Sequence, residues 1–180
     1  MLGTRTKVLA DVNVPYFNRT WEHFCLHAHT PSSCRKGYPG VTQNGKAIYF
    51  AHPIFEQYNK RAPRWCKQLV LNALEILLPE PLVRLDAPSS TLATLNLQKA
   101  QKRAVLHLLH YIPERRGTEF DIIEDVIPIY NVKVSVRAPG KVKAVTRVPE
   151  GEPLEFAESA GRIEFVLPRL EGHQMIELKL

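Results

Sequence analysis

The chain has 180 residues, of which 44% are hydrophobic and 23% are charged. This composition is typical of a globular protein and excludes a disordered chain. The net charge of +6 is uneven: residues 1–78 hold ten Lys/Arg and four Asp/Glu (+6), whereas residues 79–180 hold fourteen of each (zero). The basic residues are scattered and accompany no nucleic-acid-binding motif, so we expect no nucleic-acid partner.

No apolar run reaches the roughly 18 residues that indicate a membrane-spanning helix, so we expect no membrane partner. Residues 1–7 lack the apolar core of a secretory signal. Three cysteines, Cys25, Cys34 and Cys66, match neither a zinc signature nor a disulfide framework, and we expect free thiols and no cofactor. These features favour a cytoplasmic location without excluding export.

The first part of the chain predicts a few α/β elements. The runs 6–14 and 46–52 are short and largely apolar, as in buried strands, and the stretch between them is irregular until the turn dipeptide Asn44-Gly45. Helical spacing follows from residue 64 to residue 78. Its apolar side, which we expect to cover a sheet, consists of Trp65, Leu69, Ala73, Ile76 and Leu77. Two strands and one helix are too few for a complete parallel α/β domain, which predicts a fragment of a longer protein.

Two prolines, Pro79 and Pro81, stop this helix, and we place a domain boundary at residue 80. Beyond it the apolar residues alternate with a period of two, and turn-forming residues recur about every 10 positions. This pattern predicts an antiparallel β-sandwich over residues 81–180. Its expected strands are residues 92–97, 104–111, 132–137, 141–148, 162–167 and 174–178. The predicted fold class is therefore α+β, a partial α/β layer (residues 1–80) followed by a small sandwich.

A histidine-rich loop, residues 18–34, holds the densest group of reactive side chains. Cys25, His27 and His29 stand at i, i+2 and i+4, which would give three zinc ligands if the segment were extended. Because this spacing is not a recognised zinc signature, we expect no metal, and we interpret the loop as part of a cleft or an interface. The candidate residues for that role are Arg19, Trp21, His23, His27, His29 and, further on, His52.

Glycoside hydrolysis needs two carboxyl groups on either side of a sugar, and the best local candidates are Asp121, Glu124 and Asp125. They lie in a connection between sandwich strands. We expect these acids to be solvated or to pair with Arg115 and Arg116, and we assign no catalytic residue.

Three segments together resemble a known family: VNVPYFNRTWEHFCLHAHTP (12–31), GKAIYFAHPIFEQY (45–58) and VLHLLHYIPERRGTEFDIIEDVIPIYNVKVSV (105–136). They look like the C-terminal third of bacterial beta-galactosidase-type glycoside hydrolases. In these proteins a catalytic barrel is followed by a trimerisation domain that resembles a class I glutamine amidotransferase, then by a small β-sandwich. The resemblance implies an amidotransferase-like (flavodoxin-like) remnant in residues 1–80 and a C-terminal sandwich in residues 81–180.

The resemblance further implies a non-catalytic accessory or oligomerisation region of a carbohydrate-active enzyme, because the catalytic barrel is absent from this sequence. Its partners would be a second copy or the barrel of the parent protein. Two alternatives remain: a carbohydrate-binding sandwich and an enzyme in its own right. Sugar binding would need exposed aromatic rings, and the sandwich segment offers Tyr111, Phe120, Tyr130, Phe156 and Phe165.

Overall fold

The computed structural model describes residues 5–17 and 30–180. The chain divides into two compact units, residues 1–80 (unit 1) and residues 81–180 (unit 2), and each is described by itself. Among the described residues, no helix has both the length and the apolar character that crossing a membrane requires.

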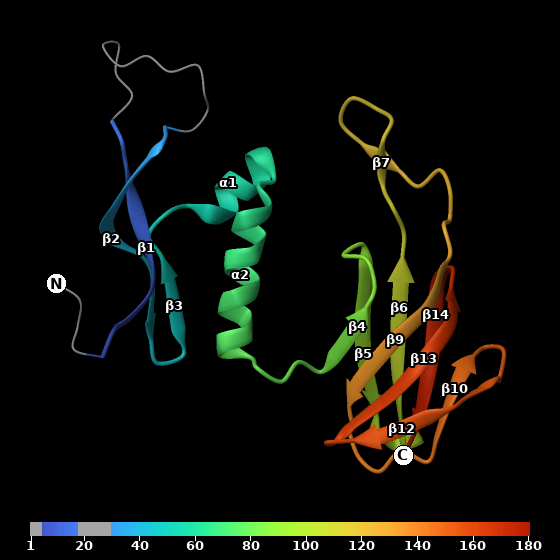
Figure 1. Ribbon diagram of the computed structural model, residues 1–180. Coiled ribbons are helices and arrows are strands. Elements are labelled where there is room, and N and C mark those ends of the chain that lie inside the picture. Colours follow the sequence, from blue (N-terminus) through green and yellow to red (C-terminus); the bar gives the residue numbers. More distant parts are fainter. Residues whose placement is uncertain (1–4, 18–29) are drawn as a thin grey trace. The chain divides into compact units, whose positions relative to one another are not determined.

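Unit 1 is an antiparallel three-stranded sheet followed by two helices (Figure 1). The strand order is β1-β2-β3, and the elements are β1 (Lys7–Pro15), β2 (Ser32–Asn44), β3 (Ala47–Phe50), α1 (Ile54–Arg61) and α2 (Arg64–Leu77). The prediction of a partial α/β, flavodoxin-like or amidotransferase-like layer is therefore wrong. Short apolar runs do not reveal strand direction, and here both runs belong to strands that pair with β2, which the sequence analysis read as irregular.

Strand β2 escaped detection because its first half is mostly polar and because Gly37, Pro39 and Gly40 are rare inside strands. These residues suit a bulged strand: the β1–β2 register shifts at four points. A Cβ atom at Gly37 would lie 3.0 Å from the carbonyl oxygen of Val12 and 3.0 Å from the Val14 side chain, so glycine permits the close approach of the two strands. The hairpin to β3 turns at Gly45, whose positive φ of 57° also suits glycine.

Prolines Pro53 and Pro63 immediately precede the two helices. Helix α1, which was not predicted, ends where Ala62 adopts a left-handed conformation and its N–H bonds the Tyr58 carbonyl at 2.7 Å. Helix α2 was predicted correctly, but its apolar side is only partly covered. Ala73 is buried, as is Cys66, whereas Trp65 and Ile76 are 51% and 46% exposed.

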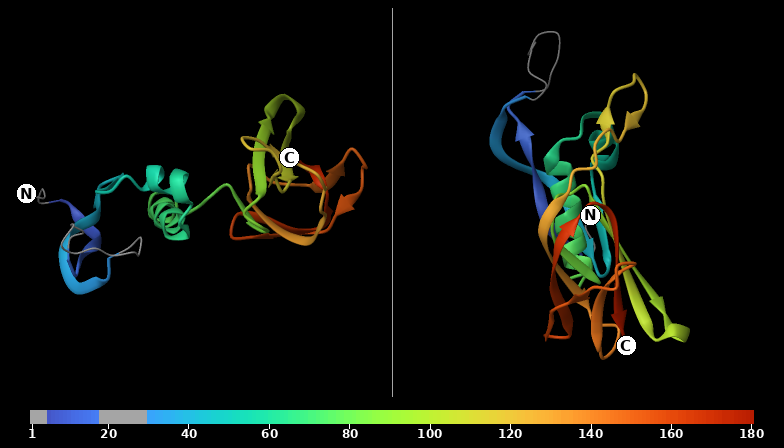
Figure 2. Two further views of the ribbon diagram at one scale, coloured as in Figure 1. Left: turned by 90° about the horizontal axis from the view of Figure 1, so that it is seen from above. Right: turned by 90° about the vertical axis from the view of Figure 1, so that its right-hand side faces the viewer.

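Unit 2 is a sandwich of two antiparallel sheets (Figure 1, Figure 2). The five-stranded sheet has the order β11-β10-β14-β6-β5 and the four-stranded sheet the order β12-β13-β9-β4. The strands are β4 (Val83–Asp86), β5 (Thr91–Gln98), β6 (Arg103–His110), β9 (Ile129–Arg137), β10 (Ala144–Val148), β11 (Pro153–Leu154), β12 (Phe156–Ser159), β13 (Arg162–Leu170) and β14 (Gly172–Lys179). A 3₁₀ turn, Lys99–Gln101, joins β5 to β6. The predicted sandwich is confirmed.

The sandwich core follows the predicted alternation. Val132, Val134 and Val136 of β9 are at most 2% exposed, while Lys133 between them faces water. They pack in a single cluster with Leu106 and Ile176 of the other sheet. One further hairpin, β7 (Glu114–Arg115) with β8 (Asp121–Ile122), projects from one end of the sandwich between β6 and β9 (Figure 1, Figure 2).

Candidate functional site

A cleft of about 1030 Å³ lies in unit 1 between the sheet and the helices. Its apolar lining includes Val41, Ile54 and Leu69, and its polar lining includes His52 and Arg61.

His52 occupies the bend between β3 and α1, at the edge of this cleft. Its Nε2 lies 3.0 Å from the hydroxyl of Tyr38 on β2, and the two rings stack with centroids 5.8 Å apart. The contact joins the loop before α1 to the sheet. Both side chains are exposed, so the pair presents polar and aromatic groups to solvent.

The outward side of α2 carries a stripe that mixes basic and apolar residues. Arg64, Lys67, Leu71 and Leu74 follow one another at intervals of three, four and three residues, which places them on one face of a helix. All four are exposed, with Leu71 at 41% and Leu74 at 46%. The two cations make no ion pair with any residue in the described ranges. We call this set the α2 stripe.

The projecting hairpin of unit 2, residues 112–128, is an arm held by ion pairs. Strands β7 and β8 pair through Glu114 with Ile122 and Arg115 with Asp121. Arg115 Nε contacts Asp121 at 2.5 Å, and Arg116 Nη2 lies 2.6 Å from a carboxylate oxygen of Glu114 and 2.5 Å from one of Glu124. Two of the three acids considered for catalysis thus pair with the arginines expected to hold them.

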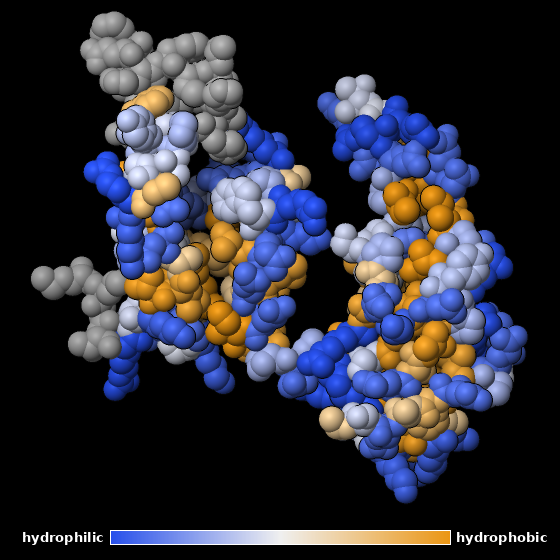
Figure 3. Space-filling model, viewed as in Figure 1, coloured by the Kyte–Doolittle hydropathy of each residue, from blue (hydrophilic) through white to orange (hydrophobic). Residues whose placement is uncertain are grey.

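The arm is also strongly apolar for an exposed segment. The six large hydrophobic residues in it are between 36% and 62% exposed: Ile112, Phe120, Ile122, Ile123, Val126 and Ile127. Figure 3 shows hydrophobic surface below the tip of the arm. The Phe120 ring lies against Gly117, where a Cβ atom would collide with it. Glycine at this position therefore lets the largest apolar side chain fold back onto the tip of the arm.

A groove of about 920 Å³ lies beside the four-stranded sheet of unit 2. Charged residues of both signs line it, among them Lys133, which lies 3.8 Å from Asp86, and Glu164, which accepts a hydrogen bond from Ser135. The aromatic side chains that line it are those of Phe156 and Phe165. Phe165 belongs to the core at 5% exposure, so the groove offers little flat apolar surface to a sugar ring.

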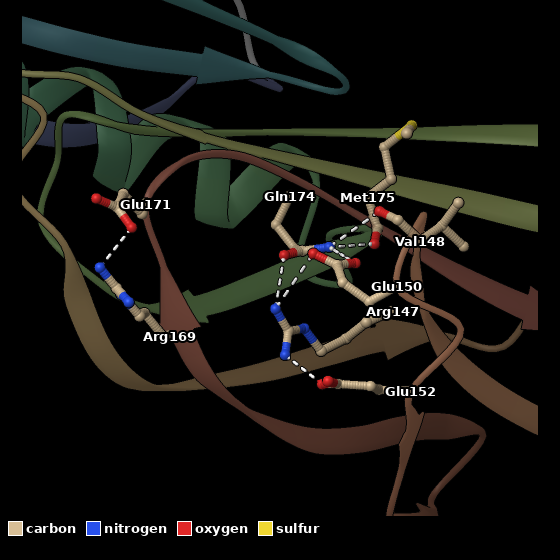
Figure 4. Close-up of polar contacts among 8 residues, drawn as sticks. All are labelled: Arg147, Val148, Glu150, Glu152, Arg169, Glu171, Gln174 and Met175. Carbon is tan, nitrogen blue, oxygen red and sulfur yellow. Dashed lines mark hydrogen bonds and ion pairs between the residues drawn. The ribbon is translucent and has the colours of Figure 1, made fainter.

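A polar network fixes the turn after β10 (Figure 4). The Arg147 guanidinium bonds Glu152 at 2.5 Å and Gln174 at 3.2 Å and contacts Glu150 at 3.4 Å, while Gln174 Nε2 donates to Glu150 and to the Val148 carbonyl. A hydrogen bond from its own backbone amide, then the bond from Gln174 and the charge of Arg147, lower the pKa of Glu150 against the opposing effect of burial. The nearby ion pair Arg169–Glu171 is separate from this network.

Most of the residues predicted for the candidate site fall outside the described ranges. Arg19, Trp21, His23, His27 and His29 lie there, as does Cys25 of the metal alternative. His52 is described and lines the unit 1 cleft. The last residues of the predicted loop, 32–34, belong to β2. Within residues 5–17 and 30–180, no three His, Cys, Asp or Glu side chains are grouped to hold a metal ion.

Sequence reasoning missed the two surfaces with the most exposed apolar residues. Leu71 and Leu74 were overlooked because they sit among the polar residues of α2, and their spacing from Arg64 and Lys67 was the available signal. In the arm, Asp121, Glu124 and Asp125 were weighed for catalysis, although the exposed isoleucines and valine beside them, at residues 122, 123, 126 and 127, distinguish the segment better.

A known enzyme structure resembles nearly the whole chain. Alpha-L-fucosidase isoenzyme 2 from Paenibacillus thiaminolyticus matches 97% of it with 38% sequence identity and a TM-score of 0.90. A cycloisomaltooligosaccharide glucanotransferase from Paenibacillus sp. matches 54% of the chain and 16% of its own length, with 12% identity and a TM-score of 0.40. No protein-family model and no curated protein matched the chain.

The fold and the first of these matches define a β-rich domain related to glycoside hydrolases. The particular relative is a fucosidase, so the expected relation to beta-galactosidases in particular is not supported, and neither are the amidotransferase-like terms. The chain spans about a quarter, 27%, of the fucosidase chain that it matches.

Proposed function

We propose that this chain is a non-catalytic accessory and assembly region of an alpha-L-fucosidase-type glycoside hydrolase. The observation that carries the proposal is the match over 97% of this chain to 27% of a fucosidase chain, at 38% identity. A shared region of this extent supports a common role within a larger enzyme, and a quarter of such an enzyme is a plausible size for a supporting region.

The chemistry of the acidic residues supports the same proposal. A glycosidase needs one carboxyl group that protonates the leaving group and a second on the other side of the sugar. In the arm, Asp121 and Glu124 are neutralised by Arg115 and Arg116. Both carboxylates are engaged in ion pairs on an exposed arm, and neither lines the cleft of unit 1 or the groove of unit 2.

A carbohydrate-binding sandwich is the second candidate, favoured by the groove beside β4, β9 and β13 with its charged and hydroxyl groups. Such groups can bond sugar hydroxyls. Tyr130 is exposed at 61% but does not line the groove, and Tyr111 is only half-buried. The shortage of an aromatic platform in the groove makes us prefer the assembly role.

One set of assays on the purified chain tests both candidates. We expect no turnover of nitrophenyl alpha-L-fucoside, no calorimetric heat with L-fucose or oligosaccharides, and concentration-dependent self-association in sedimentation velocity. Turnover that Asp121→Asn or Glu124→Gln abolishes would contradict the non-catalytic role. Sugar binding that Lys133→Ala and Glu164→Gln abolish would favour the second candidate, and a chain that remains monomeric at all concentrations would remove the assembly role.

A further inference from the structure

The geometry points to a docking contact in which the arm of one copy, residues 112–128, binds the α2 stripe of a second copy. This inference rests on the proposed assembly function and names the surfaces that perform it. Contiguous exposed apolar side chains on a soluble protein often mark interaction sites, and both surfaces contain them.

The charges of the two surfaces are complementary. The arm holds two arginines and five acids, Glu114, Glu119, Asp121, Glu124 and Asp125, a balance of −3. Glu119 and Asp125 make no ion pair within the described chain. The α2 stripe offers two cations, Arg64 and Lys67, that likewise make no ion pair with the residues that the structure describes. Two arms would repel each other, whereas an arm and a stripe attract.

Both surfaces also carry large exposed hydrophobic side chains that could pack against each other. In the arm, the exposed residues Phe120, Ile122, Ile123 and Val126 lie close in sequence to the acids Glu119 and Asp125. Leu71 and Leu74 continue the stripe beyond its cations. Four residues at these spacings cover about 15 Å of helix. Ion pairs next to the tip of the arm link its two sides, which reduces the conformational entropy lost on binding.

The contact can form twice in a pair of copies. If the arm of each copy binds the stripe of the other, the arrangement closes with twofold symmetry and leaves no further binding surface of this kind. A dimer is the smallest assembly in which every arm and every stripe is occupied.

Charge reversal tests this inference. The arm variant Glu119→Lys/Asp125→Lys and the stripe variant Arg64→Glu/Lys67→Glu should each raise the dimer dissociation constant at least tenfold in sedimentation equilibrium. Mixed in equal amounts, they should associate again, because each contact in the mixed pair joins opposite charges. Two matched controls carry the same charge changes on exposed residues elsewhere, Glu155→Lys/Glu158→Lys and Lys7→Glu/Lys46→Glu, and should dimerise like the parent chain.

The apolar share of the contact is tested by Phe120→Ser/Ile123→Ser, which should weaken dimerisation while the circular dichroism spectrum stays unchanged. If the parent chain dimerises and neither the charge variants nor this variant alters the dissociation constant, the arm–stripe contact is wrong and the assembly function stands. Tighter dimerisation of the arm variant alone would show an arm–arm contact and also overturn the inference. A parent chain that stays monomeric would overturn the assembly function itself.

Discussion

At the scale of single residues, the polar groups of unit 2 that are removed from water mostly have partners. Gln174, 7% exposed, makes bonds to a backbone carbonyl, a carboxylate and the Arg147 guanidinium. Arg162, 5% exposed, donates to the Ser135 hydroxyl and to the Pro81 carbonyl, and so attaches the segment before β4 to the sheet. Such satisfied groups specify how strands and turns meet, because leaving one unpaired would cost free energy.

The Glu150 carboxylate makes the stability of unit 2 depend on pH. The pKa of Glu150 is lower in the folded state than in the unfolded state. Its ionised carboxylate therefore adds to the free energy of unfolding at pH values above the unfolded-state pKa of about 4.3. This stabilisation is lost as the pH falls through the folded-state pKa. Glu150→Gln should lower the free energy of unfolding by about 1 kcal/mol or less at pH 7, since the ion pair that Glu150 forms with Arg147 is partly exposed to solvent.

The difference between the parent chain and this variant should be smaller at acid pH than at pH 7 in urea unfolding, because protonation of Glu150 removes the charge that the folded state favours. Glu158→Gln is the matched control on an exposed glutamate of β12 and should show no difference at either pH. A Glu150→Gln effect that persists unchanged in acid would show that the carboxylate charge is not its cause.

At the scale of elements, buried side chains stabilise the strands of the sandwich, while exposed side chains on the same sheet contribute little to the free energy of unfolding. Leu106 in the middle of β6 is fully buried in the core cluster, and Leu92 of the neighbouring β5 is 65% exposed. The two residues have the same side chain and lie in the same sheet, so comparing their alanine variants isolates the effect of burial on stability.

Leu106→Ala should lower the free energy of unfolding by about 2 to 5 kcal/mol, because it removes buried methyl groups and leaves a cavity. Leu92→Ala should change it by less than about 0.5 kcal/mol. Chemical denaturation followed by circular dichroism measures both. Equal effects at the two positions would mean that the packing of β6 in the core is not as described.

At the scale of the whole molecule, the two units have cores of very different size. Unit 2 has a cluster of fourteen buried hydrophobic residues, whereas the buried hydrophobic residues described in unit 1 are Val41, Ile54, Cys66 and Ala73. Stability rises with the apolar surface that folding removes from water, so unit 1 should be the weaker one.

Both tryptophans, Trp21 and Trp65, belong to unit 1, so tryptophan fluorescence reports on that unit alone. In a urea titration the fluorescence transition should precede the main loss of β-sheet circular dichroism, and Leu106→Ala should shift only the second transition. Coincident transitions that move together would show that the chain unfolds as one cooperative body.

The sequence by itself determined the sandwich, the helix that begins at residue 64 and the boundary near residue 80. Alternation over six segments, helical spacing and paired prolines are local signals that depend on which side chains face water. The local resemblance in segment 105–136 likewise pointed to glycoside hydrolases, although its relation to beta-galactosidases in particular is not supported.

Tertiary structure alone decided strand direction in unit 1, the existence of β2 and the exposure of the α2 stripe and the arm. Antiparallel pairing of β1 with β2 depends on residues as far apart as Lys7 and Gln43, and no local pattern records such a contact. Exposure of Trp65 and Ile76 follows from how little sheet the helix has to cover. A hydrophobic residue in a sequence indicates only that burial would be favourable, and the rest of the fold determines whether a partner surface is there to provide it.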